Sequence, residues 1–456
     1  MNQLEEPSRQ DDHGVDLPLL GMLLLLPLQW KGTLAVNLGF FLLGIGQIPF
    51  WIVFLLLTLR PHLYLRFFRC APVFHCLFLA YYLWLGISLF WAKDLGASLL
   101  LYRASIRALI FYFVMGAHLS GMTLKKASRT AALAAPLAVL LFIGYGVYAV
   151  KNTPPRDLRP GARQLAEGDP RRILLLVVNY NGEEAPDRED PEFQTATVKN
   201  QIAAGFNVLF YLFMIFATAD RRRLFNPFTV LAMVLYPVVI LGLLSRSNFG
   251  ALLIGCGMVV ICYQLSPLSN RAARIRSIAL ALLALVACGL VASLKGGVVQ
   301  DFVDAQESRY ASTGDDVRFP HYRKVFLGIT REPFFGYGIG RRASDGYAVH
   351  NIFLGSWFET GVLGLALTLF YYTTLVYYFC CCLLDLIKGR LAMPPRVANF
   401  FWLPAILTVP LVRTLIMGAW GRFQNPDMIA VAFFIVLYED ARRNSLAEPQ
   451  PCPQAS

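Results

Sequence analysis

Apolar runs long enough to cross a lipid bilayer recur along this chain, and they constrain its fold more than any other feature. A membrane-spanning helix needs about 20 mostly apolar residues, and it must satisfy its backbone hydrogen bonds within the segment. Of the 456 residues, 56% are hydrophobic and only 15% are charged. We therefore predict an all-α integral membrane protein with about twelve transmembrane helices. The candidate spans lie near residues 17–30, 35–59, 72–92, 102–120, 130–150, 201–219, 225–244, 247–265, 275–293, 350–384, 398–416 and 427–438.

The basic residues predict how these spans are oriented. Connections rich in Lys and Arg tend to face the cytoplasm. With the N-terminus in the cytoplasm, every basic cluster between spans falls on the cytoplasmic side, and so does the C-terminus. These clusters lie at residues 60–69, 125–129, 221–223, 271–276, 388–396 and 442–443. Topology thus explains much of the formal net charge of +12, which in a soluble protein would suggest a nucleic-acid partner.

The predicted topology leaves two long loops on the outer side of the membrane. The expected segments are a cytoplasmic tail (1–16), helices 1–5 (17–150), an outer loop (151–200), helices 6–9 (201–293), a second outer loop (294–349), helices 10–12 (350–440) and a cytoplasmic tail (441–456). In the second outer loop, apolar residues recur at helical spacing from Val317 to Ile329. This pattern predicts an amphipathic helix at the membrane surface.

The sequence predicts a reaction without nucleotide, cofactor or metal. The cytoplasmic connections are short and contain no glycine-rich phosphate-binding loop, so the substrate is expected to arrive already activated. His321 and His350 lack the HExxH spacing, and none of the nine cysteines lies in an outer loop. Neither a zinc site nor a disulfide framework is therefore expected on the outer side.

Residues 333–364 are the most distinctive stretch. Gly336, Gly338 and Gly340 alternate with other residues, and His350 then precedes a long apolar helix. Glycine permits backbone geometries that a Cβ forbids and allows close approach of another segment. The first turn of a helix favours a nearby anion, and a neutral imidazole there can take a proton from an attacking hydroxyl. His350 is therefore a candidate general base; the alternative is a structural histidine that only forms hydrogen bonds.

Arginines near the outer side are candidate ligands for an anionic substrate. A charge inside the bilayer costs a few kcal/mol unless it faces a polar cavity or a partner, which makes Arg246 the first candidate. Arg103 and Arg413 lie near the outer ends of other spans, and Arg318 and Arg323 belong to the predicted surface helix. For each of them the alternative is a side chain that reaches the interface or the solvent without binding substrate.

From about residue 241 to 364 the sequence resembles the O-antigen ligase family of bacterial inner-membrane proteins, which is related to the O-antigen polymerases. The matching pieces are SRS at residues 245–247, Arg318 followed four residues later by the aromatic Tyr322, PFFGYGIG, and HNIFLGSWFETGVLG. The family often has Trp where Tyr322 stands. The matching pieces follow one another in the same order as in the family.

The resemblance implies a GT-C-like, inverting glycosyltransferase with its active site at the periplasmic face of the bacterial inner membrane. The donor would be O-antigen linked to undecaprenyl pyrophosphate, and the acceptor would be a sugar of the lipid A core. Transfer would complete lipopolysaccharide. The resemblance also implies that His350 is catalytic and that Arg246 and Arg318 hold the pyrophosphate, with no metal or nucleotide needed.

Other functions fit the same pattern of spans. An O-antigen polymerase or a protein O-oligosaccharyltransferase would use the same lipid-linked donor with a different acceptor. A transporter of lipid-linked sugars would also have many spans and arginines that face an internal cavity. A transporter is expected to show repeated halves, which this sequence lacks, and it has no need of a histidine at an outer glycine-rich corner.

Overall fold

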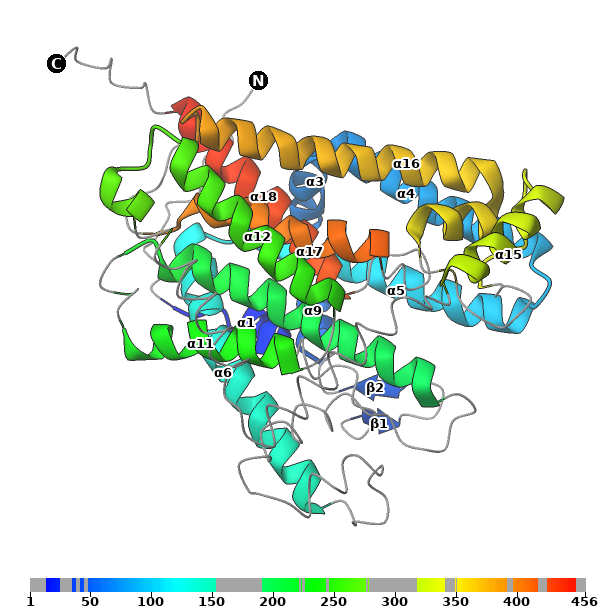
Figure 1. The fold of residues 1–456 in the computed structure, drawn as a ribbon, viewed down its shortest axis with the longest axis horizontal. Helices are drawn as coiled ribbons and strands as arrows, with labels where there is room; N and C mark the ends of the chain where they lie inside the picture. Colours follow the sequence, from blue (N-terminus) through cyan, green and yellow to red (C-terminus); the bar gives the residue numbers. More distant parts are fainter. Residues whose placement is uncertain are drawn as a thin grey trace.

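The computed structural model gives the fold of most of the chain as a bundle of helices (Figure 1). It describes residues 14–24, 35–37, 42–44, 48–152, 191–220, 223, 226–242, 246–275, 278, 318–340, 349, 351–391, 397–416 and 425–447. The elements in chain order are α1 (Leu17–Leu24), β1 (Ala35–Asn37), β2 (Leu42–Gly44), α2 (Ile48–Thr58), α3 (Pro61–Cys70), α4 (Pro72–Ile87), η3 (Ser88–Trp91), α5 (Leu95–Ser120), α6 (Leu124–Asn152), α9 (Pro191–Ala217), α11 (Pro227–Gly242), α12 (Arg246–Leu265), α15 (Arg318–Arg331), α16 (Ile352–Ile387), η7 (Phe400–Trp402), α17 (Leu403–Ile416) and α18 (Asn425–Ala447).

Several described helices are long and apolar enough to cross a membrane, as the sequence predicts. Five meet this test by length and composition, namely Pro72–Trp91, Leu95–Ser120, Leu124–Gly144, Ser247–Leu265 and Ile352–Ile387. The pair α2 and α3 makes a sixth if it counts as one broken span. The helices Ile202–Ala217 and Phe400–Leu415 are apolar but shorter. The class of multi-pass membrane protein is confirmed, whereas the number of twelve transmembrane helices stays a prediction. Most of the candidate span near 275–293 lies outside the described residues.

The predicted continuous span across residues 35–59 is wrong. Its first half contains β1 and β2, which pair antiparallel with Ala35 opposite Gly44, and α2 occupies only Ile48–Thr58. The stretch from 39 to 46 holds three glycines, which weaken a helix. Pro49 then stands at the second residue of α2, where a proline fits the first turn. The helix therefore begins there and not at residue 35.

A sharp bend separates α2 from α3. The two helices meet at 102°, at the sequence Arg60-Pro61. A proline disfavours the helical conformation of the residue before it. In α3, Leu63 and Phe67 are buried, while the arginines of the helix are exposed. This amphipathic pattern is typical of a helix that lies along a membrane surface.

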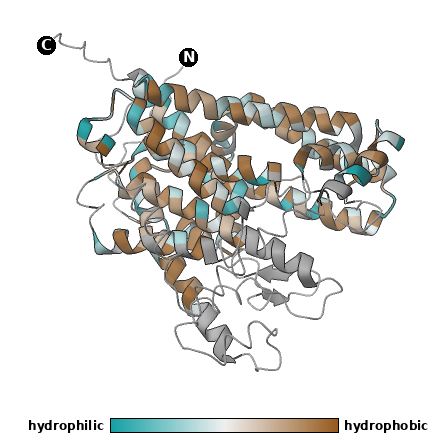
Figure 2. Cartoon of the chain, viewed as in Figure 1, coloured by the Kyte–Doolittle hydropathy of each residue, from teal (hydrophilic) through white to brown (hydrophobic). Residues whose placement is uncertain are grey.

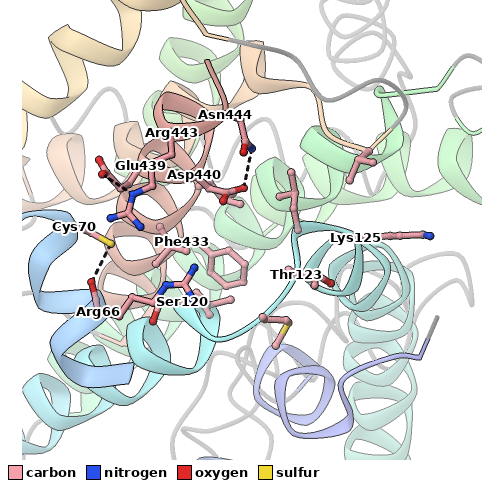
Figure 3. Close-up of a pocket in the computed structure, with 17 residues that line it drawn as sticks. Arg66, Cys70, Ser120, Thr123, Lys125, Phe433, Glu439, Asp440, Arg443 and Asn444 are labelled. Carbon is pink, nitrogen blue, oxygen red and sulfur yellow. Dashed lines mark hydrogen bonds and ion pairs between the residues drawn. The ribbon is translucent and has the colours of Figure 1, made fainter. Parts of the chain in front are cut away.

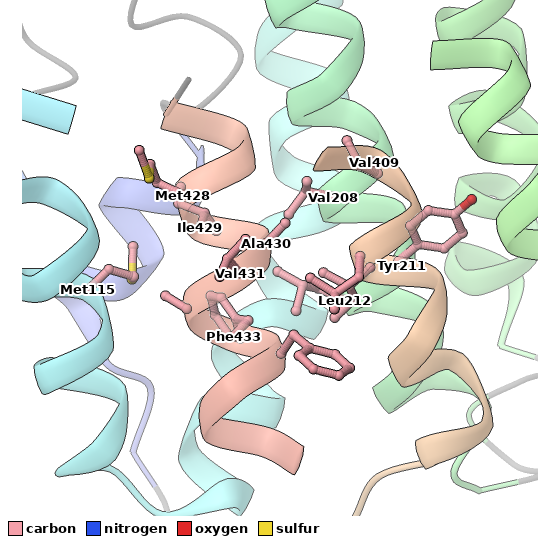
Figure 4. Packing of buried hydrophobic residues seen from close by; sticks show 14 of the residues in the cluster. Met115, Val208, Tyr211, Leu212, Val409, Met428, Ile429, Ala430, Val431 and Phe433 are labelled. Carbon is pink, nitrogen blue, oxygen red and sulfur yellow. The ribbon is translucent and has the colours of Figure 1, made fainter. Parts of the chain in front are cut away.

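The core of the bundle is formed around α9, whose residues 202–217 are almost all buried. A helix that is apolar all round is expected in the interior of a bundle. Figure 4 shows the packing of Val208 and Leu212 of α9 against Val409 of α17 and Ala430 of α18. Hydrophobic residues run along the helices, and many hydrophilic residues lie near the helix ends (Figure 2).

Contacts between helices define two ends of the bundle. At one end, called here the basic end, the ends of α5 and α18 and the start of α6 meet α3 around one pocket. Ser266 after α12 donates to the carbonyl of Leu386 in α16 at 2.6 Å, so these helix ends are joined too. At the opposite end, called the glycine end, Ser98 in the first turn of α5 donates to the carbonyl of Ile339 at 2.5 Å.

Candidate functional site

A break in α16 forms the centre of the glycine end. Gly361 has φ 72° and ψ −169°, which lies outside helical geometry and interrupts the helical hydrogen bonds around it. The amide of Val362 consequently donates to the carbonyl of Pro333, at 3.0 Å, and not along the helix. The break therefore provides main-chain groups for another segment to bind.

Residues 333–340, called here the glycine loop, bind at this break. The amide of Tyr337 donates to the carbonyl of Phe358 at 3.0 Å, and the amide of Gly338 donates to the carbonyl of Glu359 at 2.8 Å. These carbonyls precede Gly361, so the loop and the helix satisfy each other's main-chain groups. The loop is thereby held against the first part of α16.

The alternate glycines of this loop have the geometry that the sequence predicts. Gly336, Gly338 and Gly340 all have positive φ, between 67° and 85°. A Cβ on Gly336 would lie 2.7 Å from the main chain of Glu359, and one on Gly338 would lie 2.5 Å from the Cα of Ala92. A side chain at either position would therefore push the loop away from its supports.

Two tryptophans support the glycine loop from the α4 side, and the sequence analysis missed them. Trp91 in η3 donates its indole N–H to the carbonyl of Phe335 at 2.9 Å. Trp84 in α4 donates to the carbonyl of Thr360, beside the break, at 2.9 Å. Their rings lie 5.5 Å apart. Tryptophans near the ends of spans are common at membrane interfaces, so sequence alone gives them no specific role.

Asn351 begins α16 with a side-chain cap. Its Oδ1 accepts from the amides of Phe353 and Leu354 at 2.9 and 3.0 Å, which satisfies two otherwise unpaired donors. Its Nδ2 donates to the carbonyl of Leu415, near the end of α17, at 3.4 Å. The predicted helix start after His350 is confirmed. His350 itself lies outside the described residues, and its role stays a prediction.

Helix α15 lies against the start of α16. Val325 and Ile329 are buried and pack with Val349 and Phe358, as the predicted amphipathic pattern requires, whereas Phe326 of the predicted apolar face is 51% exposed. Arg323 is exposed on the other side of α15. Arg318 is the first residue of α15, and its side chain lies outside the description.

The first turn of α12 faces the same end of the bundle. Thr408 of α17 donates to the carbonyl of Ala251 at 3.1 Å, which aligns the two antiparallel helices. Arg246 lies five residues before Ala251 on α12, and Arg413 lies five residues after Thr408 on α17. Because the helices are antiparallel, both arginines lie about the same distance from this contact toward the glycine end. The structure thus brings the backbone of Arg246 to the end that carries Asn351. The side chain of Arg246 is not described.

Buried polar side chains of α9 and α12 lie next to Arg246 in the structure, at Asn207, Ser247 and Asn248. Asn207 of α9 donates from Nδ2 to the carbonyl of Asn248 at 2.7 Å. Within the described part of the chain, neither Oδ1 of Asn207 nor the buried Oγ of Ser247 has a hydrogen-bond partner. Since an unpaired buried polar atom is costly, these atoms indicate a place that suits a polar ligand or a bound water.

Arg413 has a partner inside the protein, which favours a structural role for its side chain. Its Nη1 donates to both carboxylate oxygens of Asp427 at 2.9 and 3.0 Å, and the side chains are only 3% and 2% exposed. The pair joins the end of α17 to the start of α18. Because Asp427 neutralises this guanidinium, the pair is available to join the two helices, and a role of Arg413 in pyrophosphate binding stays a prediction.

Arg103 lies on an exposed face of α5. It follows Ser98, which contacts the glycine loop, by five residues, so it is turned by roughly 140° around the helix from that contact. The structure does not bring Arg103 to the loop. This position agrees with the alternative of a side chain that reaches the interface.

Among the described residues, no three His, Cys, Asp or Glu side chains gather closely enough to hold a metal ion. The expectation of a metal-independent reaction stays a prediction.

Comparison with known proteins identifies the part of the chain that builds the glycine end. A family model described as O-antigen ligase matches residues 231–369. This match covers α12, α15, the glycine loop and α16 through its break. No curated protein matches the chain.

Proposed function

We propose that this protein is an O-antigen ligase, because residues 231–369 match a family model described as O-antigen ligase. It moves O-antigen polysaccharide from undecaprenyl pyrophosphate to a sugar of the lipid A core and so completes lipopolysaccharide. The observation that carries the proposal is the place of the matched residues in the fold. The matched residues are the ones that form the glycine loop, the broken helix and the start of α12 at one end of the bundle.

The proposed orientation places the glycine end at the periplasmic face of the bacterial inner membrane. The basic end, which includes Arg66, Lys125 and Arg443, then faces the cytoplasm, as the distribution of positive charge favours. Both termini are cytoplasmic in this arrangement. The donor, whose polyprenyl chain is apolar, enters from the membrane between helices.

The pyrophosphate of the donor binds beside the first turn of α12. Arg246 and Arg318 contact its oxygens and offset the charge that builds on the leaving group. The first-turn amides of a helix lack partners within the helix, so the start of α12 favours an anion at this place. The hydroxyl of Ser247 is available as a further donor. Arg323, exposed on α15, supplies positive charge near the entrance.

His350 acts as the general base at the start of α16. It takes the proton of the acceptor hydroxyl while the hydroxyl oxygen attacks the anomeric carbon of the donor sugar. The bond from this carbon to the pyrophosphate breaks on the opposite face, and undecaprenyl pyrophosphate leaves with the electron pair. The configuration of the anomeric carbon is therefore inverted. The sugar–pyrophosphate bond supplies the driving force, so no nucleotide is consumed.

The test is glycan transfer by the purified protein. Donor and lipid A core are incubated with EDTA and without nucleotide, and the products are separated by size and by lipid anchor. Extension of lipid A core is the expected result. Longer chains that stay on undecaprenyl pyrophosphate would identify a polymerase instead, and movement of labelled lipid across vesicles without transfer would identify a transporter.

A further inference from the structure

A pocket at the basic end lies far along the bundle from the glycine loop. It has a volume of about 310 Å³ and is enclosed by α3, the connection from α5 to α6, and the last turns of α18 (Figure 3). These segments are far apart in the sequence. None of its lining residues belongs to the proposed catalytic site.

Basic side chains outnumber acidic ones in the pocket, because Arg66, Lys125 and Arg443 line it together with Glu439 and Asp440. Arg66 of α3 and Arg443 of α18 both lie near the thiol of Cys70, on the same side of the pocket in Figure 3. Arg443 pairs with Glu439 of its own helix, with 3.0 Å between Nε and Oε1. Among the described residues no carboxylate pairs with Arg66. A guanidinium at the rim is therefore available for an anion.

The floor of the pocket is apolar. Val436 of α18 is partly exposed there, and the nearly buried Leu119, Phe433 and Leu437 lie around it. A purely ionic ligand gains nothing from such a surface, whereas a hydrocarbon chain gains about 25 cal/mol for each Å² of apolar area that it covers. The pocket therefore suits a ligand with an anionic head and an apolar tail.

Helix α3 places the pocket at the depth of lipid headgroups. It runs at 102° to α2, with buried Leu63 and Phe67 on one face and exposed Arg66 and Arg69 on the other. Leu65, between them, is 60% exposed. Exposed leucine next to arginine is favourable where hydrocarbon meets headgroups, because arginine can reach the polar layer while its stem stays in the apolar one.

From these features we propose that the pocket binds one anionic phospholipid of the surrounding leaflet. Its phosphodiester contacts Arg66 and Arg443, and the upper part of one acyl chain covers the apolar floor. Basic pockets between helices on the cytoplasmic side of membrane proteins suit such headgroups. The bound lipid connects α3 to α18 and so stabilises the basic end by mass action. The proposal does not depend on the glycosyltransferase assignment.

The test measures lipid binding to the detergent-purified full chain by native mass spectrometry. Phosphatidylglycerol and phosphatidylethanolamine with identical acyl chains are titrated separately. We expect one phosphatidylglycerol, bound about 5-fold more tightly than phosphatidylethanolamine. Arg66→Gln should weaken phosphatidylglycerol about 5-fold, and the double variant with Arg443→Gln about 25-fold, because each charge near the membrane surface contributes on that scale.

Arg69→Gln is the matched control, since Arg69 is exposed on the same helix but does not line the pocket. Equal affinity for the two lipids, or an equal loss in Arg69→Gln and Arg66→Gln, would overturn the proposal in favour of a general basic surface. Val436→Phe keeps every charge but fills the floor, and it should also weaken the lipid. Glycerol 3-phosphate that binds as tightly as the lipid would assign the site to a soluble phosphoester and so contradict the proposal.

Discussion

Replacing Gly361 with alanine should detach the glycine loop from α16. Gly361 has φ 72°, and a Cβ there would collide with the main-chain carbonyl of Phe334 and lie 2.7 Å from the amide nitrogen of Phe335. Neither contact can be relieved by turning a flexible side chain, because both partners are backbone atoms. The loop or the helix must therefore move.

The size of the effect follows from the contacts at the break. With φ 72° and ψ −169°, Gly361 lies in a region that is essentially restricted to glycine, and a residue with a Cβ pays about 1 kcal/mol or more there. Movement of the loop also removes the three main-chain hydrogen bonds that join Pro333, Tyr337 and Gly338 to α16, each worth about 1 kcal/mol. Together these terms make docking about 4 kcal/mol less favourable, which shifts the balance toward the undocked loop by about 10³-fold.

Limited proteolysis of the detergent-solubilised protein measures this detachment, with glycan transfer measured in parallel. Gly361→Ala should speed cleavage within residues 333–340 and reduce transfer strongly. Gly257→Ala is the matched control, because a Cβ on Gly257 of α12 meets nothing within 4 Å and alanine favours a helix. If the two variants are cleaved and transfer glycan alike, the broken helix does not hold the loop and this reasoning fails.

Further predictions concern a buried ion pair and an acidic group near the N-terminus. Arg413→Ala should destabilise the protein by about 3–5 kcal/mol in detergent unfolding, because the buried carboxylate of Asp427 loses its guanidinium partner. Arg413→Met with Asp427→Leu should cost less, and a larger loss in the double variant would contradict a buried pair. Asp16, which precedes α1, accepts from His118 at 2.9 Å. Burial raises the pKa of its carboxyl, but the hydrogen bonds from His118 and the amide of Leu19 lower it more, so the pKa lies below the ordinary 3.8. The stability that this carboxylate contributes is fully present above pH 3.8 and is lost as the pH falls through the lowered pKa. Unfolding measured against pH should therefore show an acid loss that Asp16→Asn lacks, and identical curves for the two proteins would refute it.

Local patterns in the sequence predict those parts of the site that depend on neighbouring residues. Helical spacing identifies Val325 and Ile329 as the buried side of α15, with Arg323 outside. The alternating glycines predict close approach, and Gly336 and Gly338 show it. Both patterns act over a few residues, so they can be interpreted without knowing the rest of the fold.

Parts of the site that depend on distant segments could not be predicted in this way. Gly361 stands in an apolar run with no local signal in the sequence, and the approach of Pro333 explains its positive φ. The sequence gives no sign that Arg413 pairs with Asp427, because the two residues lie on different helices. Trp91 has no local signal for its bond to the glycine loop. The geometry of Gly361 and the partners of Arg413 and Trp91 all depend on packing between segments that are distant in the sequence.

The most direct test of the proposed mechanism is the rate of glycan transfer in His350→Ala at saturating donor and acceptor, with donor binding measured on the same preparation. His62→Ala is the control, since His62 is exposed on α3 at the basic end. Loss of a general base predicts a rate about 10²–10⁴-fold lower in His350→Ala with donor binding retained, and a normal rate in His62→Ala. Transfer by His350→Ala at the wild-type rate would contradict the account.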